Sequence, residues 1–216
     1  MESVRKGRGL KDFMEEAINA VDAPAWFIDS CKKIGYMFPK AHAVAYVTMG
    51  LRIAYFKIFY PAQYYSCYLM RNAESFDGVR MATDSIAELK AMQEEINALE
   101  KEERERKSDE MSMLEILIEM NLRGIRVRPV DLYESDATGF RIVGETDILP
   151  PISSLPGVGQ NAAEAFVQAR AAGPFVSQEE MVRRKVSKST IEQLRLAGCL
   201  NGIPETSQVT LFDIGM

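Results

Sequence analysis

Apolar residues recur every three or four positions through most of the first 70 residues, and this spacing is typical of amphipathic helices. It predicts helices over residues 10–22, 25–33, 40–60 and 63–70. Prolines stand just outside three of these stretches, where they end one helix or allow the next to begin. The first third of the chain is therefore predicted to be all helical.

Two further helices are predicted in the middle of the chain. Apolar residues at helical spacing predict one long helix over residues 79–107, whose last part, 100–107, is nearly all charged. A second helix over 111–122 is predicted to end at Gly124, because glycine readily takes the left-handed conformation that closes a helix. We expect the charged run to be a solvated helix end that marks a boundary between subdomains.

A two-residue alternation replaces the helical spacing further along the chain. Ile125 and Val127 alternate with arginines, apolar residues flank Arg141, and a turn is expected at Gly144. This pattern predicts a small, partly exposed sheet or hairpin. Helical spacing then returns over residues 153–200, so the predicted fold class is mostly α with a small β-containing part.

The composition is that of an ordinary globular protein, with 47% hydrophobic and 26% charged residues among 216. No apolar run reaches 18 residues and no apolar signal region occurs near the start, so neither a membrane span nor secretion is expected. The three cysteines are odd in number and form no C-x-x-C motif, and we interpret them as buried thiols in the reducing cytoplasm. With a single histidine, no metal site is assigned.

Charge is unevenly distributed along the chain, although the net charge is only −5. Residues 1–60 hold nine Lys or Arg against six Asp or Glu, whereas residues 71–124 hold eight against fourteen. A basic head beside an acidic middle suggests different partners for different parts, and solvated faces are the alternative interpretation.

The clearest chemical motif is a helix–hairpin–helix signature in residues 152–166. Pro156, Gly157, Val158 and Gly159 form its loop, and Asn161 follows in the next helix. The two glycines allow φ > 0 and a close approach of backbone to a ligand, and the following helix N-terminus favours a phosphate. Such a loop holds a phosphate backbone without reading bases. The alternative is a hairpin that only packs.

A second hairpin is predicted after the first. Ser177 with Glu180, and Ser189 with Glu192, have the spacing of capping boxes and each marks a helix start. A basic cluster, Arg183-Arg184-Lys185, lies between them, and Lys188 stands just before the last predicted helix. Two adjacent hairpins could grip a duplex, but the glycines of the first are missing from the second.

The single histidine opens the long predicted helix. Lys40 and His42 lie in its first turn, where a cation is unfavourable to the helix dipole and therefore hints at a negative ligand. Tyr36, just before them, could stack on a base or pack in the core. A buried, satisfied histidine is the alternative for His42. Lys6 and Arg8 belong to a basic segment that could meet phosphate but lacks the P-loop signature.

The last residues carry a short apolar motif in a polar context. Gln208 is followed, after two residues, by the pair Leu211-Phe212. This looks like the peptide by which bacterial replication proteins bind the sliding clamp, with the pair in apolar pockets and the glutamine in hydrogen bonds. An apolar pair in a polar tail is otherwise hard to explain.

Together these features resemble one family, the PolC-type DNA polymerase III, over essentially the whole chain. Residues 29–43, which include Phe38-Pro39-Lys40-Ala41-His42-Ala43, resemble its fingers subdomain. Val130-Asp131-Leu132-Tyr133, the pair Pro150-Pro151, the hairpin and the clamp peptide follow in that family's order. The resemblance implies fingers in residues 1–75, a helical connector in 76–124, a duplex-binding domain in 125–203 and a clamp-binding tail in 204–216.

The resemblance also implies partners and site residues. Tyr36 and His42 would lie against the nascent base pair, with Lys40, Lys6 and Arg8 as candidates for contact with the deoxynucleoside triphosphate. Primer–template duplex would bind at the hairpins, and the sliding clamp at the tail. The palm subdomain, whose paired aspartates hold the Mg²⁺ ions of nucleotidyl transfer, has no counterpart here. No catalytic residue is therefore assigned, and we expect a C-terminal fragment that does not polymerise DNA alone.

Two other functions fit the same residues. The first is a stand-alone, non-enzymatic protein that binds DNA and clamp through the hairpins and the tail. The second is a DnaE-type polymerase, which ranks lower because that type continues past its hairpins into an OB-fold region. A response to nucleotide would separate the polymerase segment from the adaptor.

Overall fold

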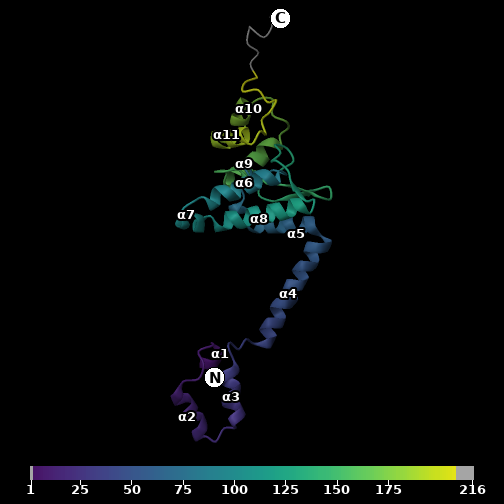
Figure 1. Ribbon diagram of the computed structural model, residues 1–216. Helices are drawn as coiled ribbons and strands as arrows, with labels where there is room; N and C mark the ends of the chain where they lie inside the picture. Colours follow the sequence, from purple (N-terminus) through teal and green to yellow (C-terminus); the bar gives the residue numbers. More distant parts are fainter. Residues whose placement is uncertain (1, 208–216) are drawn as a thin grey trace, which may run out of the picture. The chain divides into compact units, whose positions relative to one another are not determined.

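The computed structural model describes residues 2–207 (Figure 1). Its elements follow one another as α1 (Glu2–Arg5), α2 (Asp12–Ala20), α3 (Ala25–Lys33), α4 (Lys40–Phe59), α5 (Pro61–Arg71), the 3₁₀ turn η1 (Ala73–Ser75), α6 (Ile86–Asn97), α7 (Lys101–Arg106), α8 (Ser108–Leu122), β1 (Arg126–Val127), β2 (Arg141–Val143), β3 (Asp147–Leu149), the 3₁₀ turn η2 (Ile152–Ser154), α9 (Gln160–Arg170), α10 (Gln178–Arg183) and α11 (Lys188–Leu196). The predicted fold class, mostly helical with a small sheet, is confirmed.

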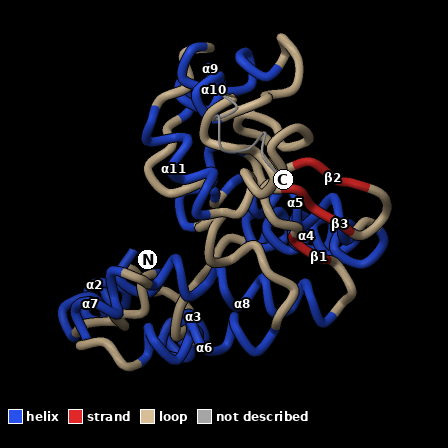
Figure 2. The backbone as a smooth tube through the Cα atoms, turned by 90° about the horizontal axis from the view of Figure 1, so that it is seen from above, coloured by secondary structure: helices blue, strands red, loops and turns tan. Residues whose placement is uncertain are grey.

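The described residues form one small three-stranded sheet, in the order β1-β3-β2 (Figure 2). Strands β2 and β3 are antiparallel and pair Ile142 with Ile148, and the turn between them contains Gly144 at φ 66°. Strand β1 pairs with β3 in parallel. The alternating pattern therefore predicted the strands and the turn, whereas the parallel partner of β1 comes from a segment about 20 residues further along.

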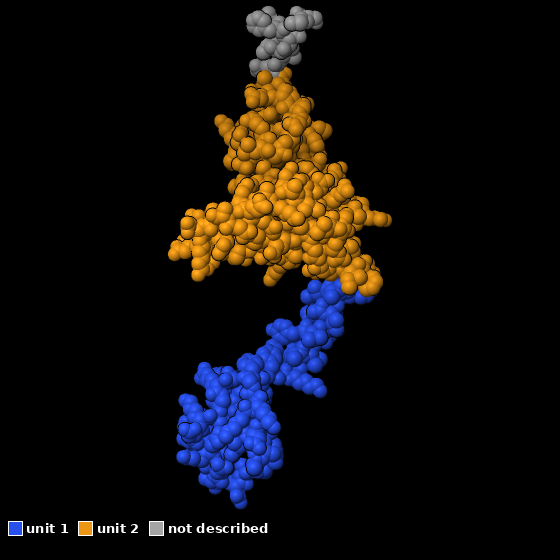
Figure 3. Space-filling view, viewed as in Figure 1, with its two compact units in different colours: residues 1–55 blue, residues 56–216 orange. Residues whose placement is uncertain are grey.

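The chain divides into two compact units, residues 1–55 and 56–216 (Figure 3). Unit 2 contains two hydrophobic cores. The first is built from α5, α6, α8 and the sheet, with Tyr65, Leu117 and Ile148 fully buried. The second gathers η2 and α9–α11 around Phe166 and Leu194. The second core is the framework that positions the hairpins.

The predicted long helix over residues 79–107 is wrong. Helix α6 begins only at Ile86, because the Ser85 hydroxyl accepts the Glu88 N–H and caps it. Before it, the Asp77 carboxylate accepts the N–H groups of Val79 and Arg80 and bends the chain into a turn. A break before α7 then separates the charged run from α6.

Helix α8 ends as its sequence predicts. Gly124 has φ 79°, in the left-handed region, and its N–H donates to the carbonyl of Asn121 at 3.0 Å. The N–H of Ile125 donates to the carbonyl of Met120, which closes the last turn and directs the chain into β1. The glycine predicted to end the helix is thus the residue whose left-handed conformation allows these closing hydrogen bonds.

The expectation that all three cysteines are buried is wrong. Cys31 is buried, but Cys67 is exposed and Cys199 is only partly buried, so the three free thiols are not all core residues. Helix α4 carries the predicted apolar residues, yet none of its 20 residues is buried. Within the described residues, no helix is both long and apolar enough to cross a membrane.

Candidate nucleic-acid interface

The first hairpin runs from η2 through a five-residue loop into α9. Gly157 has φ 73°, a conformation that residues with a Cβ rarely adopt. Val158 is 5% exposed and donates its N–H to the carbonyl of Leu155 at 3.0 Å. Its side chain lies in the second core of unit 2. The turn therefore favours glycine at position 157, because of its backbone conformation, and an apolar residue at position 158, because that side chain is buried.

Gly159 has a different role from the one expected. Its φ is −72°, so it is not left-handed, and it forms the N-cap of α9. A Cβ added at Gly157 or Gly159 would meet no atom within 4 Å. Pro156, Gly157, Gly159 and Asn161 are all exposed. The outer face of the loop is therefore open, beside the first N–H groups of α9, which have no acceptor within the helix.

A second hairpin with the same backbone plan joins α10 to α11. Lys185 has φ 68°, Val186 is 4% exposed, and Ser187 is the N-cap of α11. This order matches left-handed Gly157, buried Val158 and N-capping Gly159 of the first hairpin. The sequence pattern missed this equivalence because a lysine replaces glycine at the left-handed position.

The caps of the second hairpin partly follow the sequence. Ser177 caps α10 by accepting the Glu180 N–H at 3.3 Å, as predicted. The cap of α11 is Ser187, which accepts the Thr190 N–H at 3.1 Å, and not Ser189. Lys188 is consequently the first residue of α11 rather than the residue before it.

Only part of the basic cluster is available to a ligand. Arg183, Lys185 and Lys188 are exposed. Arg184 donates to the carbonyl of Gly173 at 2.6 Å and to the Glu180 carboxylate, and its guanidinium lies 4.9 Å from the centre of the Phe175 ring. Arg184 is therefore a structural residue that holds the turn before α10.

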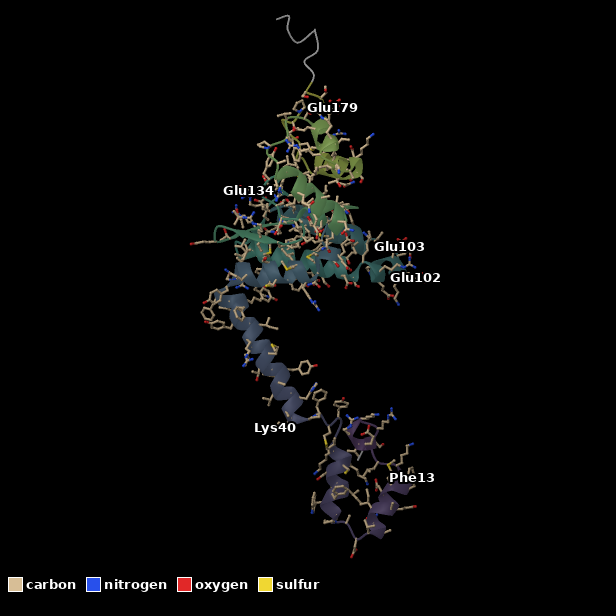
Figure 4. The ribbon with its side chains drawn as sticks, turned by 180° about the vertical axis from the view of Figure 1, so that it is seen from behind. Phe13, Lys40, Glu102, Glu103, Glu134 and Glu179 are labelled. Atoms are coloured by element: carbon tan, nitrogen blue, oxygen red, sulfur yellow. The ribbon has the colours of Figure 1, made fainter. Side chains whose placement is uncertain are left out.

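Helices α9 and α10 differ at their N-termini. The N–H groups of Gln178 and Glu179 in α10 donate to the carbonyls of Pro204 and Glu205, at 2.9 and 3.0 Å. Thr206 adds a hydroxyl hydrogen bond to the carboxylate of Glu179, which Figure 4 labels on α10. The start of α10 thus holds residues 204–206, whereas the start of α9 is open.

A glycine outside the motif supports the first hairpin. The N–H of Gly78 donates to the carbonyl of Ser154 at 2.8 Å. A Cβ at Gly78 would come within 2.3 Å of Ser154 Oγ and 3.0 Å of its carbonyl oxygen. Ser154 is buried and precedes the loop directly. No motif marks Gly78 in the sequence, and its role follows from a contact with a residue far along the chain.

The residues expected to face a nucleotide lie in unit 1. The basic segment runs beside the stretch before α4, where the Met37 N–H donates to the Arg5 carbonyl at 3.1 Å. Lys6 forms an ion pair with Glu2 at 3.0 Å, and hydrogen bonds from Arg5 and Lys6 lower the pKa of Glu2 to about 2. Arg8 is exposed. Part of the predicted positive charge is thus already balanced within the segment.

Tyr36 and His42 belong to one series of aromatic rings. The ring centres of Tyr36 and Phe38 are 5.8 Å apart, those of Phe38 and His42 4.6 Å, and those of His42 and Tyr46 4.4 Å. His42 is exposed, so its interpretation as a buried histidine is wrong. Lys40 is the first residue of α4 and is also exposed (Figure 4). The structure therefore gathers these candidates at the start of α4.

The structure does not test the predicted clamp-binding site, and the sequence predicts no metal site. The tail residues Gln208, Leu211 and Phe212 lie outside the described residues. Among the residues that the structure describes, no three His, Cys, Asp or Glu side chains come together where they could hold a metal ion. Residues 2–207 therefore do not fit a Mg²⁺ site of the kind that nucleotidyl transfer uses.

Comparison with known proteins shows what this chain is similar to. A helix-hairpin-helix motif family matches residues 124–209, which include both hairpins. The chain is 46% identical over 213 residues to each of three proteins named DNA polymerase III PolC-type, from Listeria monocytogenes, Clostridium perfringens and Bacillus subtilis. Each match covers 98% of this chain and about 15% of the relative. Along nearly its whole length, this chain is therefore similar to a segment of PolC-type DNA polymerase III proteins.

Proposed function

We propose that this chain is the duplex-binding and nucleotide-facing part of a cytoplasmic, DNA-directed DNA polymerase, and that it acts as a nucleotidyltransferase only with the rest of that enzyme. The observation that carries the proposal is the pair of hairpins, which share a left-handed residue, a buried valine and an N-cap. They lie within a stretch that a helix-hairpin-helix family matches, in a chain related to PolC-type polymerases.

The first hairpin would hold one phosphate backbone of the primer–template duplex. Its open loop at Pro156, Gly157 and Gly159 lets a phosphate approach the first N–H groups of α9, with the Asn161 amide beside them. Val158 would fix the loop from beneath. Contacts of this kind position a duplex and carry no sequence information, as a replicative enzyme requires.

The second hairpin would supply charge rather than an open loop. Lys185 and Lys188 are exposed on either side of the N-cap of α11, and Arg183 is exposed nearby in α10. Lysine and arginine side chains that meet phosphates release counterions, so they make binding salt-dependent. Two hairpins that share one core would thus bind the duplex by two different means.

The duplex contact is tested with acidic substitutions at the first loop. In Gly157→Asp/Gly159→Asp neither Cβ meets a neighbour, and aspartate tolerates the left-handed region better than most residues. The control Gly35→Asp/Gly50→Asp adds the same charge at two other glycines with open surroundings. We expect the loop variant to bind a duplex about tenfold more weakly in fluorescence anisotropy at about 100 mM salt, and the control to bind nearly as the parent does. Equal losses in both variants would refute the proposal.

Unit 1 would face the incoming deoxynucleoside triphosphate. Tyr36 and His42 lie in one exposed series of rings suited to stacking on a base, and Lys40, Lys6 and Arg8 would meet the phosphates. In the complete polymerase, His42→Ala should raise the KM for nucleotide and leave duplex affinity unchanged. The Mg²⁺ ions of nucleotidyl transfer would be held by carboxylates of the rest of the enzyme.

The tail would bind the sliding clamp through Gln208, Leu211 and Phe212. The preceding residues are anchored on unit 2, where Arg195 donates to Gln178 and lies 3.6 Å from the Glu205 carboxylate. The clamp peptide would therefore follow directly from the duplex-binding region.

A stand-alone adaptor for DNA and clamp is the second candidate. The observation that favours it is the separate hydrophobic core of the hairpin region, which includes Phe166 and Met181 and does not depend on unit 1. The two functions differ in their response to nucleotide, because an adaptor would leave His42 without effect on any nucleotide-dependent rate.

A further inference from the structure

Helix α4 is apolar on all sides but contributes no buried residue. Its 20 residues include three charged ones, Lys40, Arg52 and Lys57, and none of the 20 is acidic. Large apolar side chains are exposed along its length: Val44, Tyr46, Val47, Met49, Leu51, Ile53 and Ile58. A helix of this composition is normally an interior helix, because water would otherwise contact every face. Figure 4 shows side chains standing off the ribbon of α4 along its length.

The exposed apolar residues of α4 follow one another along the helix, unlike the scattered apolar residues of an ordinary protein surface. Single apolar residues on a surface need no special cause, but a contiguous apolar surface marks an interaction site. Val47 and Leu51 are 62% and 67% exposed and lie one helical turn apart. Arg52, exposed among them, adds one positive charge for which an acidic side chain is the natural partner.

The length of the relatives indicates what covers this surface. The match to the Listeria monocytogenes polymerase spans 98% of this chain, so it includes α4, yet it spans only 15% of the relative. In the relatives, the counterpart of α4 therefore belongs to a polypeptide roughly six to seven times as long. The large excess of chain is a source of apolar partner surface.

We propose that α4 is an interior helix of the assembled polymerase, covered by the polypeptide that the relatives carry outside the matched segment. The inference rests on the proposed function. The covering surface would be apolar opposite Val47 and Leu51, with an acidic group opposite Arg52. The helix thus joins the part of the enzyme held in this chain to the part that supplies the remaining subdomains.

A binding experiment with matched variants tests the proposal. The 216-residue chain is mixed with a Bacillus subtilis PolC-type polymerase that lacks the matched segment and that circular dichroism has first shown to be folded, and complex formation is measured by calorimetry. Val47→Gln/Leu51→Gln changes two exposed α4 residues, and Val176→Gln/Leu196→Gln changes the same two residue types at 62% and 61% exposure in unit 2. We expect the α4 variant to bind at least tenfold more weakly and the control to bind as the parent does. No complex, or equal binding by all three chains, would overturn the proposal.

Further measurements on the same three chains distinguish this interface from the hairpins and from self-association. Duplex affinity should be equal among them, so failure of the α4 proposal is distinguishable from failure of the hairpin proposal. Sedimentation of the chain alone tests for a second copy as the occupant, and a dimer that the α4 variant abolishes would overturn the proposal. In the intact relative, the two substitutions at the aligned positions should lower the melting temperature, whereas in this chain alone they should not. An unchanged melting temperature in the relative would also count against it.

Discussion

Lys185 holds the same left-handed backbone in the second hairpin that Gly157 holds in the first, with φ 68° and 73°. Each is followed by a buried valine and an N-capping residue. A side chain with a Cβ is disfavoured in this region, and persistence of such strain points to a role for the side chain. In the second hairpin, the exposed ammonium of Lys185 would take the place of the open loop that Gly157 provides.

Substitution of Lys185 by glycine should therefore change stability and binding in opposite directions. Lys185→Gly relieves the left-handed strain and should stabilise the fold by about 1 kcal/mol, measured by urea denaturation. The same change removes a charge beside the N-cap of α11 and should weaken duplex binding. Lys185→Ala keeps the strain and should weaken binding without stabilising the fold. A Lys185→Gly chain that binds duplex as well as the parent would leave the lysine without this role.

Gly78 should behave as a positioning residue of the first hairpin. In Gly78→Ala the new Cβ would meet Ser154 Oγ and carbonyl, so Ser154 must move, at a cost of roughly 1–3 kcal/mol. Because Ser154 precedes the loop directly, the duplex affinity of Gly78→Ala should fall as well, when it is measured well below the temperature at which the variant unfolds. Ser154→Ala combined with Gly78→Ala removes the shortest contact and should restore part of both losses. Gly35→Ala, where a Cβ meets nothing within 4 Å, is the control. A loss of stability with unchanged affinity would limit Gly78 to packing.

The contact between Lys57 and Glu119 should make stability depend on pH. The Lys57 ammonium lies 2.7 Å from Glu119 Oε1, and Tyr65 donates to the same carboxylate at 3.1 Å. The hydrogen bond from Lys57 is the main reason why the pKa of Glu119 is lowered in the folded chain. A lowered carboxyl pKa contributes stability that is present above the unfolded value of 4.5 and is lost as the pH falls through the folded value.

Glu119→Gln should therefore destabilise the chain at pH 7 and differ less from the parent as the pH falls from about 5 toward 3. The same contact raises the pKa of Lys57, so its contribution is lost only as the pH rises through that raised value, above 10.5. Urea denaturation of both chains across this range measures the effect. Glu145→Gln, at an exposed turn carboxylate, is the control. A parent–variant difference that stays constant from neutral to acidic pH would contradict the assignment.

Removal of the tail peptide should separate clamp binding from duplex binding. Deletion of residues 208–212 should abolish capture of the chain by an immobilised bacterial sliding clamp, since Leu211 and Phe212 are the expected apolar anchors. Duplex affinity should be retained, because Glu205 and Thr206 keep the preceding segment on α10 and α11. Capture that survives the deletion would refute the tail assignment.

Local patterns in the sequence were sufficient wherever neighbouring residues make the structure. Helix α4 starts after a proline and ends before one, Gly124 closes α8, and the Pro-Gly-Val-Gly turn leads into α9, because caps, φ preferences and helical spacing act over a few residues. The same local information singled out the aromatic and basic residues near the start of α4, whose role remains a prediction. It also carried the family resemblance that the comparisons bear out.

Features that depend on contacts between distant parts of the chain could not be predicted from the sequence. Gly78 matters through Ser154, β1 pairs with a strand about 20 residues later, and Lys185 takes the place of a glycine because the second core holds Val186 beneath it. A one-dimensional pattern could not reveal these relationships, because each depends on which surfaces meet when the chain folds. Helix α4 is a further example. The apolar residues of this helix are typical of a buried helix, but the sequence does not reveal which surface covers them.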